Sequence, residues 1–168
     1  MAGSKEEKQM DLKILIDDAT QNELQDIKKL FFETVSGIPG NEYNAKQIKA
    51  WASSAQNDDD KWLSQIIDHY FIVAKVDEKL VGFASLKDNN IIDMLYIHKK
   101  FQGKSIAQKL LSLLEKKADI NRADKIVSFV SLTARSFFEK NGYKVVKEQN
   151  RTLNDVVIPN LKMVKKLH

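Results

Sequence analysis

The 168-residue sequence contains no cysteine, only two prolines and six glycines, and no long uninterrupted run of apolar residues. The lack of cysteine excludes disulfide bonds, zinc–thiolate sites and a cysteine acyl-enzyme. No segment has the length of a bilayer-spanning helix, and the polar, lysine-rich N-terminus lacks the apolar stretch of a secretory signal. The absence of a spanning helix and of a secretory signal favours, by default, a cytoplasmic, bacterial protein without a membrane partner, whereas the lack of cysteine does not fix the compartment.

The composition is that of an ordinary globular chain, with 43% hydrophobic and 30% charged residues. Pro39 and Pro159 are far apart, and no repeat or Pro/Gly/Ser-rich linker divides the sequence. We interpret residues 1–10 as a disordered extension or tag remnant and residues 11–168 as a single domain. The net charge of +4 comes from scattered lysines. Because no dense basic stripe with interleaved aromatics occurs, we expect a solvated surface and no nucleic-acid partner, although a basic mouth for a polyphosphate ligand remains open.

Hydrophobic periodicity and turn residues predict a mixed α+β fold. The predicted strands are residues 12–16, 69–76, 80–86, 91–98, 126–130, 143–146 and 156–164; the predicted helices are residues 21–35, two short ones starting after Asn44 and at 58–60, then 105–118 and 133–141.

This order predicts a three-strand antiparallel meander over residues 69–98, followed by a crossover helix and a strand parallel to 91–98. The strand at 126–130 is apolar except for Ser128, which predicts burial on both faces. A turn near residues 150–155 is expected to separate the last two strands.

The most informative segment is residues 91–107, where a buried strand, a short polar loop and an amphipathic helix follow one another. The first N–H groups of a helix lack backbone partners and carry partial positive charge, so such a junction suits a phosphate or diphosphate. Gly103, Ser105 and Ala107 are small enough to let a ligand reach the backbone, and Lys104 adds charge. An ordinary strand-to-helix turn gives the same pattern, so spacing alone leaves both interpretations open.

A resemblance to a known family gives this segment a more specific interpretation. Residues Gln102-Gly103-Lys104-Ser105-Ile106-Ala107 resemble the acetyl-CoA diphosphate loop of GNAT acetyltransferases, Gln/Arg-x-x-Gly-x-Gly/Ala, although Ser105 stands where the family usually has glycine. Residues 131–143 resemble the family segment Asn-x-x-Ala-x-x-Phe-Tyr-Glu-Lys-x-Gly-Phe. Both matches occur in the family's order and separation.

The resemblance implies a GNAT-like sheet, mixed and mostly antiparallel, with a splayed parallel strand pair and flanking helices. It also implies acetyl-CoA as co-substrate, no metal, an amine acceptor and a monomer or homodimer. The implied acetyl-CoA-binding residues are Leu95, Tyr96, Ile97, Gln102, Gly103, Lys104, Ser105, Ile106, Ala107, Gln108, Ser131, Ala134, Phe137 and Phe138. Phe32 and Trp51, in the N-terminal helices, are expected to line the acceptor pocket, although core packing is the alternative.

Amine acetylation needs a neutral amine and therefore benefits from a general base. Asp93 is the main candidate, because a carboxylate inside the apolar run 91–97 is costly unless it is paired, lies at a bulge or edge, or has a function. His98 is a second candidate base, whereas His69 is expected to be a surface residue at a strand start without a metal.

The leaving thiolate is expected to take a proton from an acid. The family's usual tyrosine acid is replaced by Phe138, which has no proton to give. Ser131 replaces the usual asparagine. Tyr96 and Tyr143 are therefore the candidate catalytic acids, with Ser131 a third possibility. The absent hydroxyl also favours an alternative function, that of a catalytically weak acyl-CoA-binding or sensing module.

Overall fold

The computed structural model describes residues 13–168, in which a seven-stranded sheet has the order β1-β2-β3-β4-β5-β7-β6. The strands are β1 (Ile14–Asp18), β2 (Tyr70–Val76), β3 (Lys79–Lys87), β4 (Ile91–Ile97), β5 (Lys125–Ser131), β6 (Lys144–Leu153) and β7 (Val156–Lys166). Among these described strands, only β4 and β5 pair in parallel, and every other neighbouring pair is antiparallel. The predicted α+β class, the meander and the central parallel pair are confirmed. The extension predicted for residues 1–10 lies outside the described residues.

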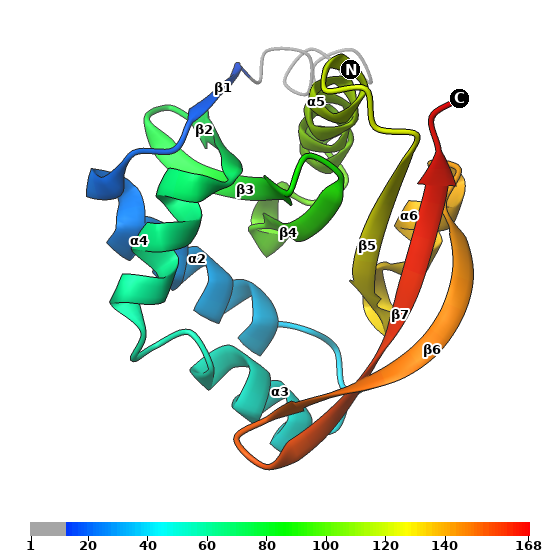
Figure 1. Cartoon of the computed structure of the whole chain (residues 1–168). Helices are drawn as coiled ribbons and strands as arrows, with labels where there is room; N and C mark the ends of the chain where they lie inside the picture. The colour runs from blue at the N-terminus through cyan, green and yellow to red at the C-terminus, as the bar shows by residue number, and fades with distance from the viewer. Residues whose placement is uncertain (1–12) are drawn as a thin grey trace, which may run out of the picture.

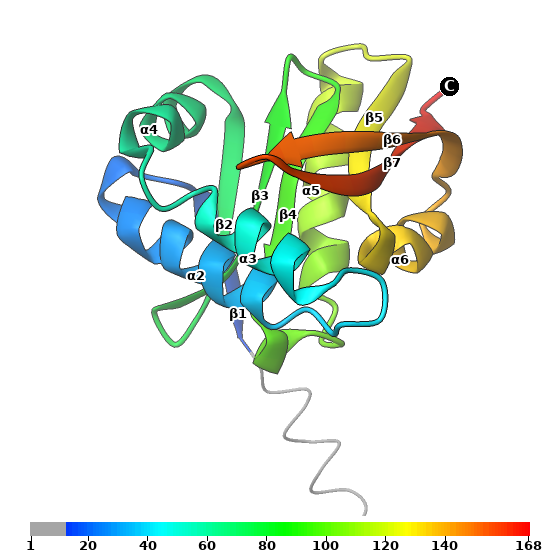
Figure 2. The same ribbon diagram turned by 90° about the horizontal axis from the view of Figure 1, so that it is seen from below.

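Helices cover both faces of the sheet (Figures 1 and 2). The helices are α2 (Leu24–Ser36), α3 (Ala45–Ser53), α4 (Asp59–Asp68), α5 (Ile106–Ile120) and α6 (Arg135–Lys140), with short 3₁₀ segments η1 (Gln21–Glu23), η2 (Lys99–Phe101) and η3 (Leu132–Ala134). Helices α5 and α6 pack on one face, around Leu110, Leu114 and Phe138, whereas α2 and α4 pack on the other, around Phe31 and Trp62. Across residues 13–168, no helix combines the length and apolar character that crossing a bilayer requires.

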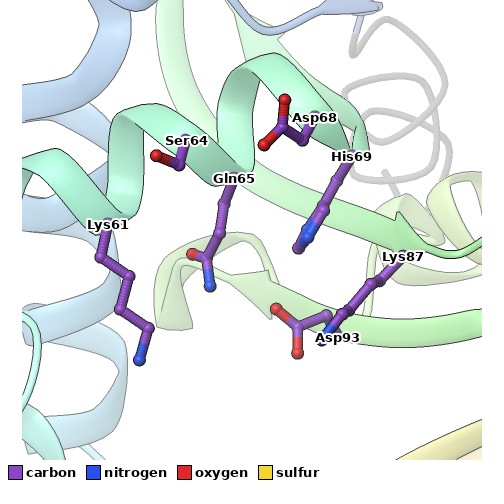
Figure 3. Close-up of a pocket in the computed structure, with 7 residues that line it drawn as sticks. All are labelled: Lys61, Ser64, Gln65, Asp68, His69, Lys87 and Asp93. Carbon is purple, nitrogen blue, oxygen red and sulfur yellow. The ribbon is translucent and has the colours of Figure 1, made fainter.

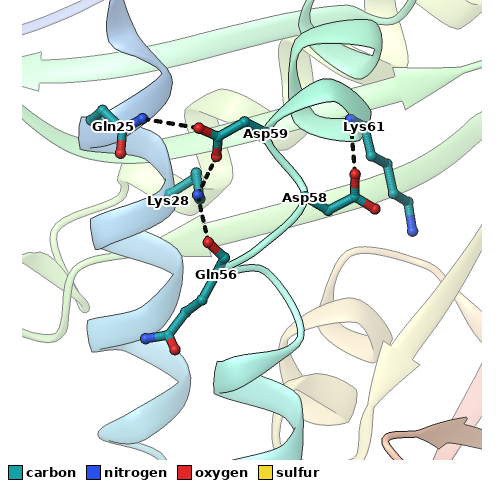
Figure 4. A network of polar contacts seen from close by, with 6 residues as sticks. All are labelled: Gln25, Lys28, Gln56, Asp58, Asp59 and Lys61. Carbon is teal, nitrogen blue, oxygen red and sulfur yellow. Dashed lines mark hydrogen bonds and ion pairs between the residues drawn. The ribbon is translucent and has the colours of Figure 1, made fainter.

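Short polar contacts fix the starts of helices α3 and α4. Asn44 caps α3 by accepting a hydrogen bond from the Gln47 N–H at 2.8 Å, and the Gln47 side chain accepts one in return from the Asn44 N–H. Asp58 caps α4. Next to it, Lys28 of α2 binds both Asp59 and the Gln56 carbonyl (Figure 4). These contacts hold the start of α4 against α2.

The C-terminal hairpin is longer than the sequence predicts. Strand β6 continues to Leu153, and the turn expected over residues 150–155 is confined to Asn154 and Asp155, both with left-handed backbone. The predicted end of this strand at residue 146 was wrong. Because β6 is an edge strand whose polar side chains face solvent, its sequence shows little of the apolar–polar alternation that marks a strand. The hairpin lies against α3 (Figure 1), where the Gln47 amide donates to the Val157 carbonyl at 3.0 Å.

Strand β5 is buried on one face only, contrary to the prediction. Ile126, Ser128 and Val130 face α5 and α6 and are buried, but Phe129 is 47% exposed. The reason is tertiary, since helices α2 and α3 pack mainly against β3, β4 and β7 and leave this side of β5 open.

Candidate active site

The parallel strands β4 and β5 separate shortly after they begin. Their pairing comprises only Ile91 with Val127 and Ile92 with Ser128, and the Ser128 hydroxyl donates to the Ile92 carbonyl at 3.2 Å. From Met94 to Ile97, β4 is paired with β3 alone. The backbone edge of β4 that faces β5 is therefore open, which leaves polar groups available to a ligand.

A β-bulge lies at the point of separation. Ser85 of β3 stands opposite Met94, but the next residue, Leu86, stands opposite Ile92, so Asp93 has no partner in the register. Ile92 and Met94 consequently belong to core clusters on opposite faces of the sheet. Bulges re-aim side chains, and this one leaves Asp93 exposed rather than buried among its apolar neighbours.

A cavity of about 610 Å³ occupies the opening between the two strands. The cavity is lined by all the residues that the family resemblance assigned to acetyl-CoA, except Lys104. Asp93 and Trp51 line it as well. The remaining lining residues, which no sequence motif indicated, are Thr34, Ile38, Ile92, Met94, Phe101, Ser128, Val130 and Thr133. Ser128 had a visible signal, since it is the only polar residue in the run 126–130. The structure therefore gathers residues from both halves of the chain around a single space.

The loop before α5 has a backbone that leaves room on the cavity side. Gly103 has φ of 75° and Ser105 has φ of 67°, both left-handed. A Cβ atom added at Gly103 would meet nothing within 4 Å. Ser105 precedes α5 without providing a side-chain cap, so the first-turn N–H groups lack that partner. Gln102 anchors the loop by donating to the Ile97 carbonyl at 3.1 Å. This arrangement can accept an anionic group at a helix N-terminus.

Tyr96 is the tyrosine that the cavity contains. Its ring packs edge-on against Phe31, with 5.0 Å between centroids. Burial raises the pKa of Tyr96 to about 12, against the opposing influence of the Arg151 charge and of a hydrogen bond with Trp51. The hydroxyl therefore stays protonated near neutral pH and can act as a hydrogen-bond donor.

Tyr143, the other candidate acid, lies away from the cavity. It is 2% exposed, and its hydroxyl donates to Glu115 at 3.4 Å. Burial, together with the Glu115 charge, raises its pKa. Its ring packs against Phe138, which is buried and, unlike Tyr143, lines the cavity. The position of Tyr143 in the core therefore does not support the role predicted for it.

Two further candidates occupy a different part of the surface. Phe32 projects from the outer side of α2, since Phe31 takes the inward position, and it lines a separate groove together with His98. The His98 Nδ1 accepts a hydrogen bond from the Lys100 N–H, and its Nε2 lies 3.7 Å from Glu33. Neither residue borders the β4–β5 cavity. Phe32 was predicted to line an acceptor pocket, and its position on α2 places it in this separate groove.

Tyr43, which lies shortly before α3, links distant segments of the chain. It is 2% exposed, and its hydroxyl donates to the Pro159 carbonyl at 2.7 Å while accepting from the Leu132 N–H at 2.9 Å. It therefore ties the segment before α3 to β7 and to η3, directly after β5.

Known proteins share this architecture. A family model described as an acetyltransferase (GNAT) domain matches residues 40–167. The uncharacterized N-acetyltransferase YafP of Escherichia coli K12 is 29% identical over 127 residues, which span 76% of this chain and 79% of that protein. A crystal structure of a GCN5-related N-acetyltransferase from Rhodopseudomonas palustris superposes with a TM-score of 0.89 at 27% identity, covering 93% of this chain and 98% of that one. The PaiA N-acetyltransferase of Thermoplasma acidophilum, solved with coenzyme A, has a TM-score of 0.76 at 24% identity over 92% and 99% of the two chains, a likeness of fold.

Proposed function

Because the chain belongs to the GNAT acetyltransferase family and is thus an acyltransferase, we propose that it transfers the acetyl group of acetyl-CoA to a primary amine of a small molecule or protein, by direct attack in a ternary complex. The observation that carries this proposal is the β4–β5 separation at Asp93, with a cavity that runs from there to the N-terminus of α5.

The residues around the cavity fit acetyl-CoA. The left-handed backbone at Gly103 and Ser105 and the start of α5 would hold the diphosphate. The open edge of β4 from Leu95 to Ile97 would pair with the amide groups of the pantetheine arm. The structure of the Thermoplasma acidophilum relative, whose fold this chain shares, contains coenzyme A.

The reaction joins the amine nitrogen to the thioester carbonyl carbon, then breaks the carbon–sulfur bond and releases the CoA thiolate. The tetrahedral oxyanion between these steps needs a fixed donor, and a backbone N–H of β4 near Leu95 or Tyr96 would supply it. Asp93, at the bulge, would accept the proton that the amine loses, directly or through water. Tyr96, which keeps its proton, would donate a hydrogen bond to the departing sulfur. Holding the two substrates together in the cleft supplies a further part of the rate.

A second candidate rests on Phe138, which is 4% exposed, lines the cavity and has no hydroxyl. If the Tyr96 hydroxyl does not replace the missing one, the protein binds an acyl-CoA but turns it over slowly, as a sensing module would.

Calorimetry with acetyl-CoA and steady-state release of free CoA across a panel of primary amines test these two functions. Turnover with double-reciprocal plots that intersect supports transfer in a ternary complex, and parallel plots contradict it. Binding without turnover on any amine favours the sensing module. An absence of heat with acetyl-CoA rejects both.

A further inference from the structure

Asp93 borders a second cavity, on the α4 side of the sheet. This cavity has a volume of about 340 Å³ and is lined by Lys61, Ser64, Gln65, Asp68, His69, Lys87 and Asp93. Four of these residues come from α4, one ends that helix, one ends β3 and one is the bulge of β4 (Figure 3). All seven side chains are charged or able to hydrogen-bond, in contrast to the aromatic and aliphatic residues that dominate the β4–β5 cavity.

The charged groups of this polar cavity carry both signs. Lys61 and Lys87 are cationic, and Asp68 and Asp93 are anionic. Within residues 13–168, none of the four forms an ion pair, whereas the neighbouring Asp59 is engaged by Lys28. Charges that face a cavity without internal partners are free to pair with a ligand.

His69 adds a polar atom that the fold itself does not satisfy. Its backbone N–H donates to the Gln65 carbonyl at 2.9 Å, which fixes the residue at the end of α4. Its Nδ1 is buried and has no hydrogen-bond partner among the described residues. The sequence predicted a surface residue at a strand start; His69 does directly precede β2 and is partly exposed, but its Nδ1 is buried. Buried polar atoms are nearly always paired in proteins, so an unpaired one beside a cavity points to a bound molecule or water.

We propose that this polar cavity receives the acceptor, and that the acceptor is an amine that also carries a carboxylate, such as a free amino acid. The inference rests on the proposed function. Asp93 is the residue that the two cavities have in common, so an amine directed toward it lies next to the thioester. The carboxylate of the same molecule then pairs with Lys61 and Lys87. An amine without a carboxylate would have no group to pair with these lysines, which disfavours it.

Matched pairs of amines with and without a carboxylate test this substrate class. The pairs are L-lysine and cadaverine, L-histidine and histamine, and L-phenylalanine and phenethylamine, each assayed by CoA release. We expect the carboxylate-bearing member of at least one pair to have a kcat/KM higher by about tenfold or more, the gain expected from charge-assisted hydrogen bonds. Equal or faster turnover of the decarboxylated member in every pair would overturn the inference.

Variants separate the role of the lysines from acetyl-CoA binding. In the double variant Lys61→Gln/Lys87→Gln we expect KM for the preferred amino acid to rise about tenfold or more, with unchanged acetyl-CoA affinity. Both lysines are exposed, so their replacement leaves the core intact. Lys116→Gln, on the exposed side of α5, is the matched control. An unchanged KM in the double variant would refute the assignment.

Two further results distinguish the possible failures. Loss of acetyl-CoA binding in the unmodified protein would reject the proposed function itself. If acetyl-CoA binds but no amine is turned over, calorimetric titration of the three amino acids into the CoA complex decides the question. Heat that disappears in the double variant supports the polar cavity as an amino-acid site, and no heat with any of them overturns it.

Discussion

Replacing Gly103 by glutamate tests the diphosphate site most directly. Gly103 precedes α5, and its φ of 75° brings the backbone to the open side of the loop. The introduced carboxylate would lie where the proposal puts the diphosphate, so the change opposes the ligand by charge. Gly103→Gln introduces a side chain of the same size without the charge and is the matched control.

The structure allows the two effects of this substitution to be separated. A new Cβ meets no atom within 4 Å, so neither variant creates a clash. Both place a non-glycine residue in left-handed backbone, which costs roughly 1–2 kcal/mol of stability in each. The free energy of unfolding should therefore fall by a similar amount in the two variants, and any difference between them in ligand affinity reports the charge.

Coulomb's law gives the size of that difference. At about 6 Å, one pair of like charges costs roughly 0.7 kcal/mol at the dielectric constant of water and roughly 2.8 kcal/mol at an effective value near 20. For the two charges of a diphosphate, the penalty is about 1.4–5.5 kcal/mol, or about tenfold to ten-thousandfold in Kd. Added salt should reduce it, because the loop is exposed.

Isothermal calorimetry with acetyl-CoA, at two salt concentrations, measures this effect. We expect Gly103→Glu to bind at least about tenfold more weakly than Gly103→Gln, with the gap narrowing in high salt. Equal affinities of the two variants would show that the diphosphate does not bind at this loop, and the proposed placement would then be wrong.

Three other predictions address the neighbouring residues. Asp93→Asn should lower kcat by about a hundredfold or more and leave acetyl-CoA affinity unchanged; an unaltered kcat would make the carboxylate structural. Ser105→Gly should change the free energy of unfolding by less than about 1 kcal/mol. Ser105→Val should lower the free energy of unfolding, measured by urea titration, by about 1–3 kcal/mol, because a β-branched residue resists the left-handed backbone at this position. The pKa of Tyr96 is raised in the folded state to about 12, so the unfolded chain loses that proton first and stability falls as pH rises from about 10 to 12. Over this pH range, Tyr96→Phe should lose less stability than the unmodified protein, by about 2–3 kcal/mol in total. Identical profiles of unfolding free energy against pH in the two proteins would contradict the buried environment assigned to Tyr96.

The sequence predicted elements whose signals are local. Asn44 and Asp58 cap helices, and Gly142 takes the left-handed backbone (φ 92°) expected of a residue that ends one. The apolar stripe of α2, which includes Leu30 and Phe31, faces the core as its spacing indicated. Each of these features depends on residues within one or two turns of one another, so their pattern is readable along the chain.

Residues that depend on a distant partner were harder to assign. Asp93 stood out as a carboxylate in an apolar run, but its bulge exists only because β3 pairs with β4 out of step between Ser85 and Leu86. Tyr143 and Tyr96 look equivalent in sequence, yet packing buries the first beside Glu115 and brings the second to the cavity.

By itself, the sequence determined the order of helices and strands, the strand–loop–helix junction around Gly103 and the family resemblance, because periodicity, caps and short motifs are properties of neighbouring residues. The resemblance implied that the parallel strands separate, but only the tertiary structure decided that they do so directly after Ile92 and that α4 comes to lie beside Asp93. Those arrangements arise from strand register and from packing between segments far apart in the chain, which no local pattern specifies.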